Sequence, residues 1–379
     1  MAMLHLALEA GLRPYVVTVD HCLREGSAAE ALQVRAACHA AGLDHETLHW
    51  RGWDGQGNLQ DAARRARRRL IGEWAQAQGV RAVALAHTAD DVAETFLMRL
   101  ARGAGLNGLS AMAARFTDQG VTWLRPLLWA KRADLRAYLT TRGAMWSEDP
   151  SNDNTRFDRV RARKALVVLA PLGLSAPRLA EVASHLADAR AALDAVTDRA
   201  ADCLTSPDGL VVTIDHEALA SHPSEIRRRL ILRVLHWLAR SDYGPRGPAL
   251  TALLERIAQN RPATLAGCRF VPKGPKTLAF REENSVATLR CPATDLWDNR
   301  WRIVGPAPAA AEIAALGSTG LTQCPKWRAT GLPRAALLSS PALWLQDTLI
   351  AAPFAAPTAE FSVIPLQGVA VLHQSAISD

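Results

Sequence analysis

Short apolar runs alternate with amphipathic stretches along the first half of the chain. The runs at residues 15–19, 47–50 and 81–86 have the length and the apolar content of buried strands. The stretches around them repeat apolar positions at helical spacing, and a glycine stands at or just beyond the end of all four. Helices are therefore predicted over residues 1–10, 27–42, 58–78 and about 90–103. This alternation predicts an α/β fold, a doubly wound parallel sheet with helices on both faces.

The pattern changes after residue 170. Alanine, leucine and arginine repeat at helical spacing over residues 176–204 and 223–240, and a further helix is predicted over residues 249–259. The segment TLAGCRFVPKGPKTLAFRE, residues 264–282, has the composition of strands, and the periodicity weakens beyond it. We therefore predict an α/β domain over residues 1–165, a helical domain over residues 166–290 and a small C-terminal region of mixed structure over residues 291–379.

Composition and charge narrow the class of protein. The 379 residues are 49% hydrophobic, which excludes an intrinsically disordered chain and leaves room for two or three domains. The net charge is +7 and the pI is about 9.4, a balance that suits a polyanionic partner. A GC-rich genome produces the same excess of arginine and alanine, so composition alone leaves both explanations open.

The six cysteines are scattered and form no CxxC pair, which disfavours a zinc ribbon, an iron–sulfur cluster or a redox dithiol. Reduced thiols in a cytoplasmic protein are the simplest interpretation. No apolar run is long enough to span a bilayer, and no basic segment precedes the first apolar stretch. We therefore expect a cytoplasmic protein that does not bind membranes.

Polar side chains follow two of the predicted strands. Asp20 and His21 come directly after the first strand, and His87 follows the strand at residues 81–86. Ligands of open α/β sheets bind at the carboxyl ends of the strands. These three residues therefore mark a candidate binding site.

The segment AHTADDVAETFLMRLARGAGLNGLSAM, residues 86–112, is the densest in residues able to carry chemistry. Asp90, Asp91 and Glu94 are spaced to lie together in the first turns of a helix. One interpretation is helix capping, because acidic side chains are favoured where backbone N–H groups are free. The other is a site where a metal nucleotide meets a nucleophile, which His87 and the glycine-rich run that follows favour.

Three segments are rich in arginine. The predicted helix NLQDAARRARRRL carries arginines four residues apart, which repel each other by roughly a few tenths of a kcal/mol per pair. The segment WSEDPSNDNTRFDRVRARKAL is a polar turn followed by a second basic run, and it resembles a hinge between domains. These faces are either solvated or neutralise the phosphates of a nucleic acid. The basic runs lie at residues 64–69, 156–163 and 227–233.

Six segments together resemble the tRNA(Ile)-lysidine synthetase family of PP-loop ATP pyrophosphatases. They are VDHCLR, LQDAARRAR, AHTADDVAET, RLARGAGLNGLSAM, RPLL and WSEDPSNDN, in the order and spacing of that family. No single motif is decisive, but the series is specific. The resemblance covers residues 1 to about 165, and TLAGCRFVPKG is similar to the family's C-terminal substrate-binding region.

The resemblance implies a fold and a reaction. The fold is an adenine nucleotide alpha-hydrolase-like domain, followed by a helical domain that binds tRNA and a small mixed α/β tail. The reaction uses ATP and Mg²⁺ to join free lysine to C2 of the wobble cytidine of a minor tRNA-Ile with a CAU anticodon. It passes through an adenylated base and releases pyrophosphate and then AMP. Relatives also suggest a homodimer.

The resemblance also assigns roles to residues of this chain. Asp91 and Glu94 match the catalytic positions, where a carboxylate can bind the lysine ammonium and help to take its proton. Asp90 is the candidate Mg²⁺ ligand. The residues assigned to ATP are Asp20, His21, Arg64, Arg67 and His87, and those assigned to tRNA are Arg99, Arg102, Arg125, Arg156, Arg159 and Arg161.

One part of the family pattern is not found in the chain. The family carries a strand and an SGGxDS loop, which cradles the ATP phosphates, immediately before the helix at residues 1–10. We expect about 20 to 30 upstream residues to restore that strand and loop. Two alternatives remain: a catalytically inactive tRNA-binding remnant, or another PP-loop tRNA-modifying enzyme. A tRNA thiolase needs paired cysteines, which are absent from the sequence.

Overall fold

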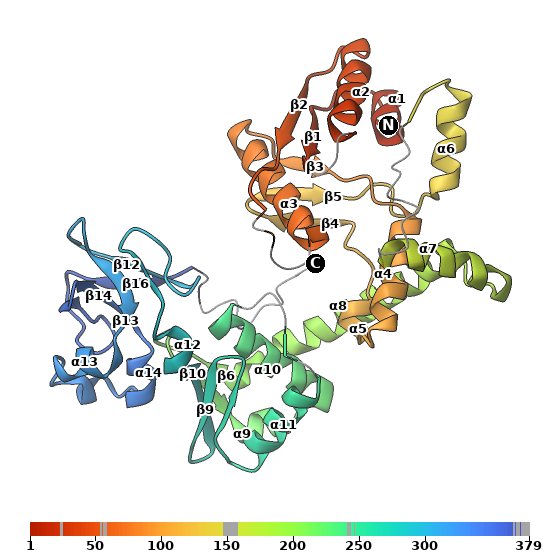
Figure 1. Ribbon diagram of the computed structural model, residues 1–379. Helices are drawn as coiled ribbons and strands as arrows, with labels where there is room; N and C mark the ends of the chain where they lie inside the picture. The colour runs from red at the N-terminus through yellow and green to blue at the C-terminus, as the bar shows by residue number, and fades with distance from the viewer. Residues whose placement is uncertain are drawn as a thin grey trace. The chain divides into compact units, whose positions relative to one another are not determined.

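The computed structural model divides into two compact units, an N-terminal unit over residues 1–190 and a C-terminal unit over residues 191–376 (Figure 1). The predicted boundaries at residues 165 and 290 stay a prediction. The structure describes residues 1–22, 26–53, 55, 59–146, 158–240, 244–245, 247–366, 368 and 372.

The N-terminal unit alternates strands and helices, as the sequence pattern predicts. Every predicted helix and strand of this region is confirmed to within a few residues. Elements that were not predicted, α5, α6, α7, η2, β4 and β5, complete the unit. In order the elements are α1 (Ala2–Glu9), β1 (Val16–Asp20), α2 (Ser27–Ala40), β2 (His45–His49), α3 (Leu59–Ala77), β3 (Ala82–Ala84), α4 (Ala89–Ala101), α5 (Leu106–Leu109), β4 (Arg115–Asp118), β5 (Val121–Leu124), α6 (Arg132–Thr141), α7 (Asp158–Leu169), η2 (Ala170–Leu172) and α8 (Ala176–Ala200), which continues into the second unit.

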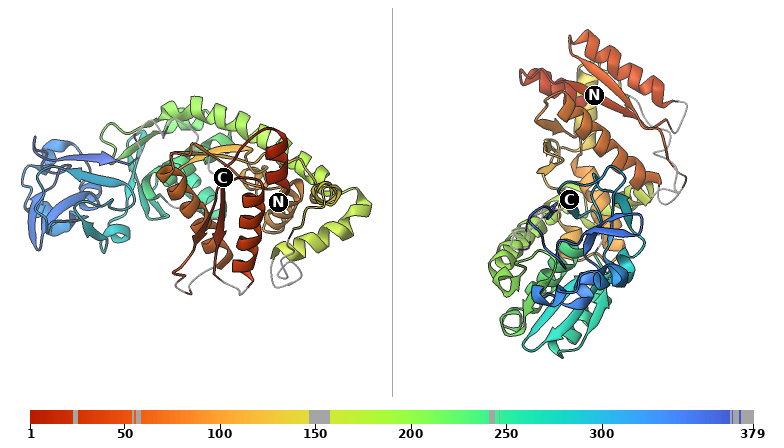
Figure 2. Two further views of the ribbon diagram at one scale, coloured as in Figure 1. Left: turned by 90° about the horizontal axis from the view of Figure 1, so that it is seen from above. Right: turned by 90° about the vertical axis from the view of Figure 1, so that its left-hand side faces the viewer.

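Parallel pairing defines the sheets of this unit. β1 pairs with β2 in parallel, with Asp20 opposite His49 at the carboxyl ends. β3 pairs in parallel with β5, and β4 lies antiparallel on the other side of β5. Figures 1 and 2 show α2 along β1 and β2, in agreement with its contacts to both strands. The described strands therefore form a two-stranded and a three-stranded sheet, both with the parallel pairing of the α/β class.

Two apolar clusters hold the elements that carry the candidate site. On α3, Ile71, Trp74 and Ala75 are buried in one cluster with Val83 of β3 and Trp123 of β5. The second cluster joins α4 to α8. Its α4 members are spaced at i, i+3, i+4 and i+7, the apolar face of an amphipathic helix: Ala89, Val92, Ala93 and Phe96.

The C-terminal unit has two cores. The first lies between the five-stranded sheet β6-β7-β10-β9-β8 and helices α10 and α11, and the second surrounds the four-stranded sheet β11-β13-β14-β15. The elements are η3 (Ala201–Cys203), β6 (Leu204–Thr205), β7 (Val212–Asp215), α9 (His216–Ala220), α10 (Ser224–Ala239), α11 (Gly247–Ala258), β8 (Ala263–Leu265), β9 (Cys268–Lys273), β10 (Lys276–Arg281), α12 (Glu283–Val286), β11 (Arg290–Pro292), β12 (Trp301–Val304), β13 (Glu312–Ala315), α13 (Gly317–Thr322), η4 (Trp327–Thr330), α14 (Arg334–Leu338), β14 (Pro341–Leu345), β15 (Thr348–Ala351) and β16 (Ser362–Pro365).

Within the described ranges no single helix is long and apolar enough to cross a membrane. One helix pair, residues 158–172 with 176–203, meets that test together, by length and composition alone, and is bent by 96°.

Candidate functional site

The start of α4 carries the carboxylates that the sequence singled out. Thr88 caps the helix: its backbone N and its Oγ1 both donate to Asp91 Oδ2 at 2.8 Å. The capping interpretation is therefore confirmed for Asp91. Its other oxygen, Oδ1, lies 3.5 Å from Arg132 Nη2. Burial opposes the ionisation of Asp91, but the bonds from Thr88 and the charge of Arg132 outweigh it and lower the pKa of the carboxyl.

Glu94 lies one turn further along α4 and is only 1% exposed. Its Oε1 accepts from Arg163 Nε at 2.9 Å and from both Nη1 and Nη2 of Arg132 at 3.3 Å. Its Oε2 is buried and has no hydrogen-bond partner among the described residues. Two guanidinium groups thus stabilise one oxygen, and the second remains as an acceptor inside the protein.

The sequence did not assign Arg132 and Arg163 to the site. Arg163 lies in a basic run, and no feature of the sequence distinguishes it from the other arginines of that run. Arg132 stands outside every arginine run and reaches Glu94 only because α6 begins beside α4. Asp90 fixes that start, since its Oδ2 accepts from the backbone N of Arg132 at 2.7 Å.

Asp90 was predicted to bind Mg²⁺. With Oδ2 held by α6, its second carboxylate oxygen is the one that can serve a metal. In the described part of the chain Asp90 belongs to no group of three ligating side chains. One carboxylate oxygen suits a magnesium ion that is held mainly by phosphates and water.

A small cationic cavity, of about 20 Å³, lies near these carboxylates. Burial lowers the pKa of Arg64 and of Arg67, and neighbouring arginines lower both further. Burial also lowers the pKa of His87 to about 4, so its imidazole is neutral at pH 7. The cavity is lined by Arg64, Arg67, Arg68, Ile71, Leu85, His87, Trp123 and Arg125.

Negative charge offsets this cluster only in part: Arg68 pairs with Asp118 at 3.4 Å, and Asp91 attracts Arg67 electrostatically. In the described ranges no carboxylate forms an ion pair with Arg64, Arg67 or Arg159. Nδ1 of His87 and Nδ1 of His21 are both buried without a hydrogen-bond partner there. Crowded, partly desolvated cations beside unsatisfied polar atoms are stabilised by a multivalent anion such as a polyphosphate.

The predicted ATP-binding residues come together, apart from Asp20. Burial lowers the pKa of His21 most, and the charge of Arg67 lowers it further. His21 is therefore close enough to interact electrostatically with an arginine of the cavity. The ring of His21 also meets Trp50 edge-on, with the ring centroids 5.6 Å apart. Asp20 is 5% exposed and instead accepts from the backbone N of Cys22 at 2.8 Å.

The arginines predicted to contact tRNA lie in several environments. Arg102 and Arg161 both form ion pairs with Asp158, and Arg99 donates to the carbonyl of Gly108 at 2.9 Å. Arg159 interacts electrostatically with Asp91 and the cavity arginines. Arg125 is 3% exposed and stacks over Phe116 in the cavity wall, and Arg156 lies outside the described residues.

The third basic run, residues 227–233 on α10, corrects one expectation. Arg228 pairs with Glu225 at 2.7 Å, and Arg229 is buried against Asp194 and Glu225 at 2.5 and 2.9 Å. Arg233 pairs with Asp198 at 2.8 Å. Carboxylates of the protein therefore already neutralise these three arginines, and for the buried Arg229 neither expectation holds, a solvated face or contact with RNA phosphates.

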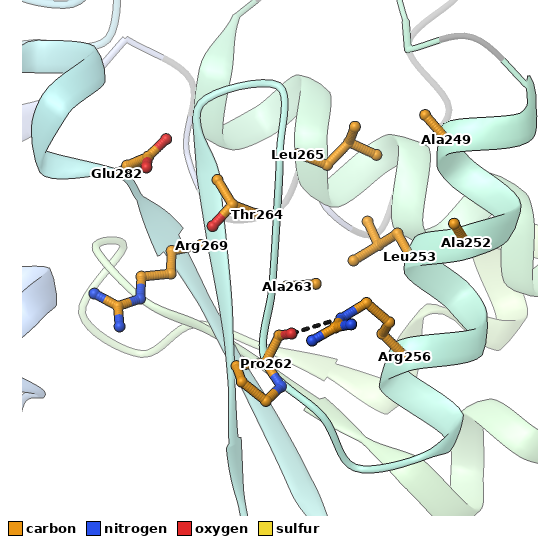
Figure 3. Close-up of a pocket in the computed structure, with 10 residues that line it drawn as sticks. All are labelled: Ala249, Ala252, Leu253, Arg256, Pro262, Ala263, Thr264, Leu265, Arg269 and Glu282. Atoms are coloured by element: carbon orange, nitrogen blue, oxygen red, sulfur yellow. Dashed lines mark hydrogen bonds between the residues drawn. The ribbon is translucent and has the colours of Figure 1, made fainter.

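A larger hollow, of about 590 Å³, lies in the C-terminal unit between α11 and β8. The TLAGCRF segment forms its wall through the β8–β9 hairpin. Figure 3 shows Arg256 reaching from α11 to Pro262, whose carbonyl accepts from Nε at 2.7 Å, and Arg269 on the other side of the hairpin. The hollow is basic but open, and it carries no cluster of acid–base groups.

Comparison with known proteins gives the family. A family model described as a PP-loop domain matches residues 1–170. A tRNA(Ile)-lysidine synthase of Ruegeria pomeroyi is 48% identical over 90% of this chain and 81% of its own length. One from Bradyrhizobium diazoefficiens is 40% identical over 70% of this chain and 75% of its own length. A solved U34-tRNA thiolase, NcsA of Methanococcus maripaludis with its [4Fe-4S] cluster, shows only a distant likeness: TM-score 0.41 and 14% identity, over 49% of this chain and 67% of that one. The chain belongs to the tRNA(Ile)-lysidine synthase family.

Proposed function

We propose that this chain joins free lysine to C2 of the wobble cytidine of tRNA-Ile with a CAU anticodon, at the expense of ATP. The observation that carries the proposal is the buried Glu94, whose Oε2 has no partner in the described part of the chain, beside a cavity of arginines. A carboxylate oxygen for an ammonium and a cationic cavity for phosphates are the two sites that the reaction needs.

The arginines around the small cationic cavity bind the ATP phosphates. Arg64 and Arg67 supply charge-assisted hydrogen bonds, and neutral His87 supplies a further polar contact. Mg²⁺ held between the phosphates and Asp90 would reduce their mutual repulsion. This arrangement serves the first step, in which O2 of the cytidine attacks the α-phosphorus and pyrophosphate leaves.

Glu94 and Asp91 serve the second step. Lysine arrives with its side chain as an ammonium. The ammonium can donate hydrogen bonds to Oε2 of Glu94 and to Oδ1 of Asp91. A carboxylate or water then takes its proton, the neutral amine attacks C2, the C2–O bond breaks and AMP leaves. Arg132 and Arg163 keep the Glu94 carboxylate in place from its other oxygen.

The relatives support this reaction over the two alternatives. The 48% identity to a named synthase over 90% of the chain favours it over an inactive remnant and over a different PP-loop enzyme. Contacts of Arg102 and Arg161 with tRNA phosphates stay predictions, because Asp158 already pairs with both arginines. The homodimer and the cytoplasmic location stay predictions.

Labelled lysine tests the proposal directly. The protein is mixed with ATP, labelled lysine and a tRNA-Ile transcript that carries CAU, and label in the RNA is measured. We expect ATP-dependent labelling, and none with a transcript that carries UAU in place of CAU. Tight binding of the CAU transcript without labelling would overturn the proposal in favour of a tRNA-binding remnant.

A further inference from the structure

A second cluster of chemistry-bearing side chains lies at the carboxyl ends of β1 and β2. Asp20 and His49 are register partners at the ends of the two parallel strands, and Cys22 follows β1 by two residues. His49 Nδ1 is 3.7 Å from Asp20 Oδ2 and 3.9 Å from Cys22 Sγ. The three ligand atoms all lie within 4.8 Å of one another. They are a carboxylate oxygen, an imidazole nitrogen and a thiol sulfur.

The separations fit a tetrahedral zinc site. With Zn–S near about 2.3 Å and Zn–N or Zn–O near about 2.0–2.2 Å, tetrahedral geometry puts ligand atoms about 3.4–3.6 Å apart. The two separations from His49, 3.7 and 3.9 Å, differ from this by a few tenths of an ångström, and the third, between the Asp20 carboxylate and Cys22 Sγ, is at most 4.8 Å. Small rotations of the exposed side chains of His49 and Cys22 therefore bring all three onto one ion.

The backbone conformation at Cys22 brings the three ligand atoms close together. Cys22 has φ of +52°, in the left-handed region that favours glycine, so a side chain is kept here at some conformational cost. Its N–H donates to Asp20 Oδ1 at 2.8 Å, which turns the second oxygen toward His49. A hydrogen bond that orients a ligating carboxylate in this way is a usual feature of metal sites. Cys22 is also the one exposed thiol among the six cysteines.

We propose that Asp20, Cys22 and His49 bind one thiophilic divalent cation, zinc by geometry, and leave a fourth position open. The thiolate and the imidazole select such a cation over Mg²⁺, which prefers oxygen ligands. The ion would tie the end of β1 to the end of β2 and fix the backbone beside His21. Asp20 would then serve as a metal ligand, which explains why it stands apart from the cationic cavity.

Cobalt substitution tests the site without any use of the lysine-transfer reaction. The protein is treated with a chelator, and Co²⁺ is titrated as a spectroscopic probe. We expect one equivalent to give intense tetrahedral d–d bands and a thiolate-to-cobalt charge-transfer band, both removed by one equivalent of Zn²⁺. Cys22→Ser should remove the charge-transfer band. His49→Gln should weaken Co²⁺ binding by more than about 100-fold, beyond the usual effect of losing a residue that only orients a ligand.

Two control variants match the ligands in type. Cys291→Ser changes a half-buried thiol and His39→Gln an exposed histidine, and neither should alter the spectrum. Circular dichroism of each variant checks that it is folded. A charge-transfer band that survives Cys22→Ser, or no tetrahedral spectrum in the folded wild type, overturns the site. Alkylation of Cys22 at the same rate with and without Zn²⁺ overturns it as well.

Discussion

Helices α3 and α10 carry similar arginine runs but use them differently. On α3 the outer arginines pair along the helix, Arg65 with Asp61 and Arg69 with Glu73. Three arginines line the cavity: Arg68 pairs with Asp118, whereas no described carboxylate forms an ion pair with Arg64 or Arg67. On α10 the inward arginine, Arg229, meets carboxylates instead. Arginine spacing alone does not separate an anion site from a structural ion pair. The position of the carboxylates separates them.

The presence or absence of carboxylates beside the inward arginines therefore gives each helix a distinct role. Inward cations without carboxylates form a ligand site, because a bound anion must offset their repulsion and desolvation. Inward cations with carboxylates stabilise the fold, and removing one partner leaves an uncompensated charge. The same distinction applies to acidic residues. Glu94 is buried, and two arginines bind only one of its carboxylate oxygens, so the other can accept a bond from a ligand. Asp158 also binds two arginines, but at the surface.

The largest expected effect follows Glu94→Gln. Loss of the carboxylate should slow lysine transfer by about 10²- to 10⁴-fold, the usual range for a group that handles a proton. ATP-dependent pyrophosphate release on tRNA should continue, because that step uses the cationic cavity. The matched control is Asp158→Asn, which also removes a carboxylate bound by two arginines. Equal losses in both variants, or equal losses in both steps, would contradict the role of Glu94.

A somewhat smaller effect is expected from Arg229→Met on α10. Leaving Asp194 without its buried partner should lower the free energy of unfolding by about 3 kcal/mol, with little change in tRNA affinity. Arg227→Met on the same helix is the contrast, since no described carboxylate pairs with Arg227. The Arg227→Met variant should have an unchanged free energy of unfolding. Its plot of log tRNA affinity against log salt concentration should have a slope smaller in magnitude by about one. Urea denaturation and filter binding measure the two quantities, and a reversed outcome would break the comparison.

The cavity arginines should show a moderate effect. Arg67→Ala removes a charge-assisted contact worth about 1.5–3 kcal/mol, so ATP should bind roughly 10- to 100-fold more weakly. Arg65→Ala, two residues away, removes an exposed arginine that already pairs with Asp61 at 3.2 Å, and ATP affinity should hardly change. Equilibrium dialysis with labelled ATP compares the two. A similar loss of ATP affinity in both variants would show that ATP binding depends on the total charge of α3 and not on which arginines line the cavity.

The contrast between the two helices also marks the limit of prediction from sequence. Most elements of the N-terminal unit were predictable from apolar spacing, whereas α5, α6, α7, η2, β4 and β5 were not. The position of Asp91 and Glu94 in the first turns of a helix was predictable too, whereas their catalytic role stays a prediction from the family resemblance. Arg132 was not predictable, since α6 reaches α4 across 38 residues of chain. The burial of Arg229 was hidden for the same reason: Asp194 and Asp198 come from α8, whereas only Glu225 stands at helical spacing.

The smallest effect concerns His87, which shares the cavity with the arginines and is forced to stay neutral. Its pKa is about 4 in the folded protein, below the ordinary value of 6.5, because burial and nearby arginines oppose its charge. The unfolded chain therefore binds more protons between those two values, and folding stability must fall as pH drops from 6.5 toward 4.

The expected loss from His87 is about 1–2 kcal/mol over this window, after allowance for its partial exposure. Burial also lowers the pKa of His21 and of His45 from 6.5, so both histidines add to the loss in this window and only the difference between wild type and variant isolates His87. The lowered pKa of Asp91 acts in the same direction, but below its ordinary value of 3.8. Urea denaturation at pH 7 and at pH 4.5 measures the loss, and His87→Gln should reduce it because glutamine does not titrate. A wild type and a His87→Gln variant that lose stability equally would mean that His87 takes up its proton in the folded state. The cavity would then be less cationic than the arginines of α3 imply.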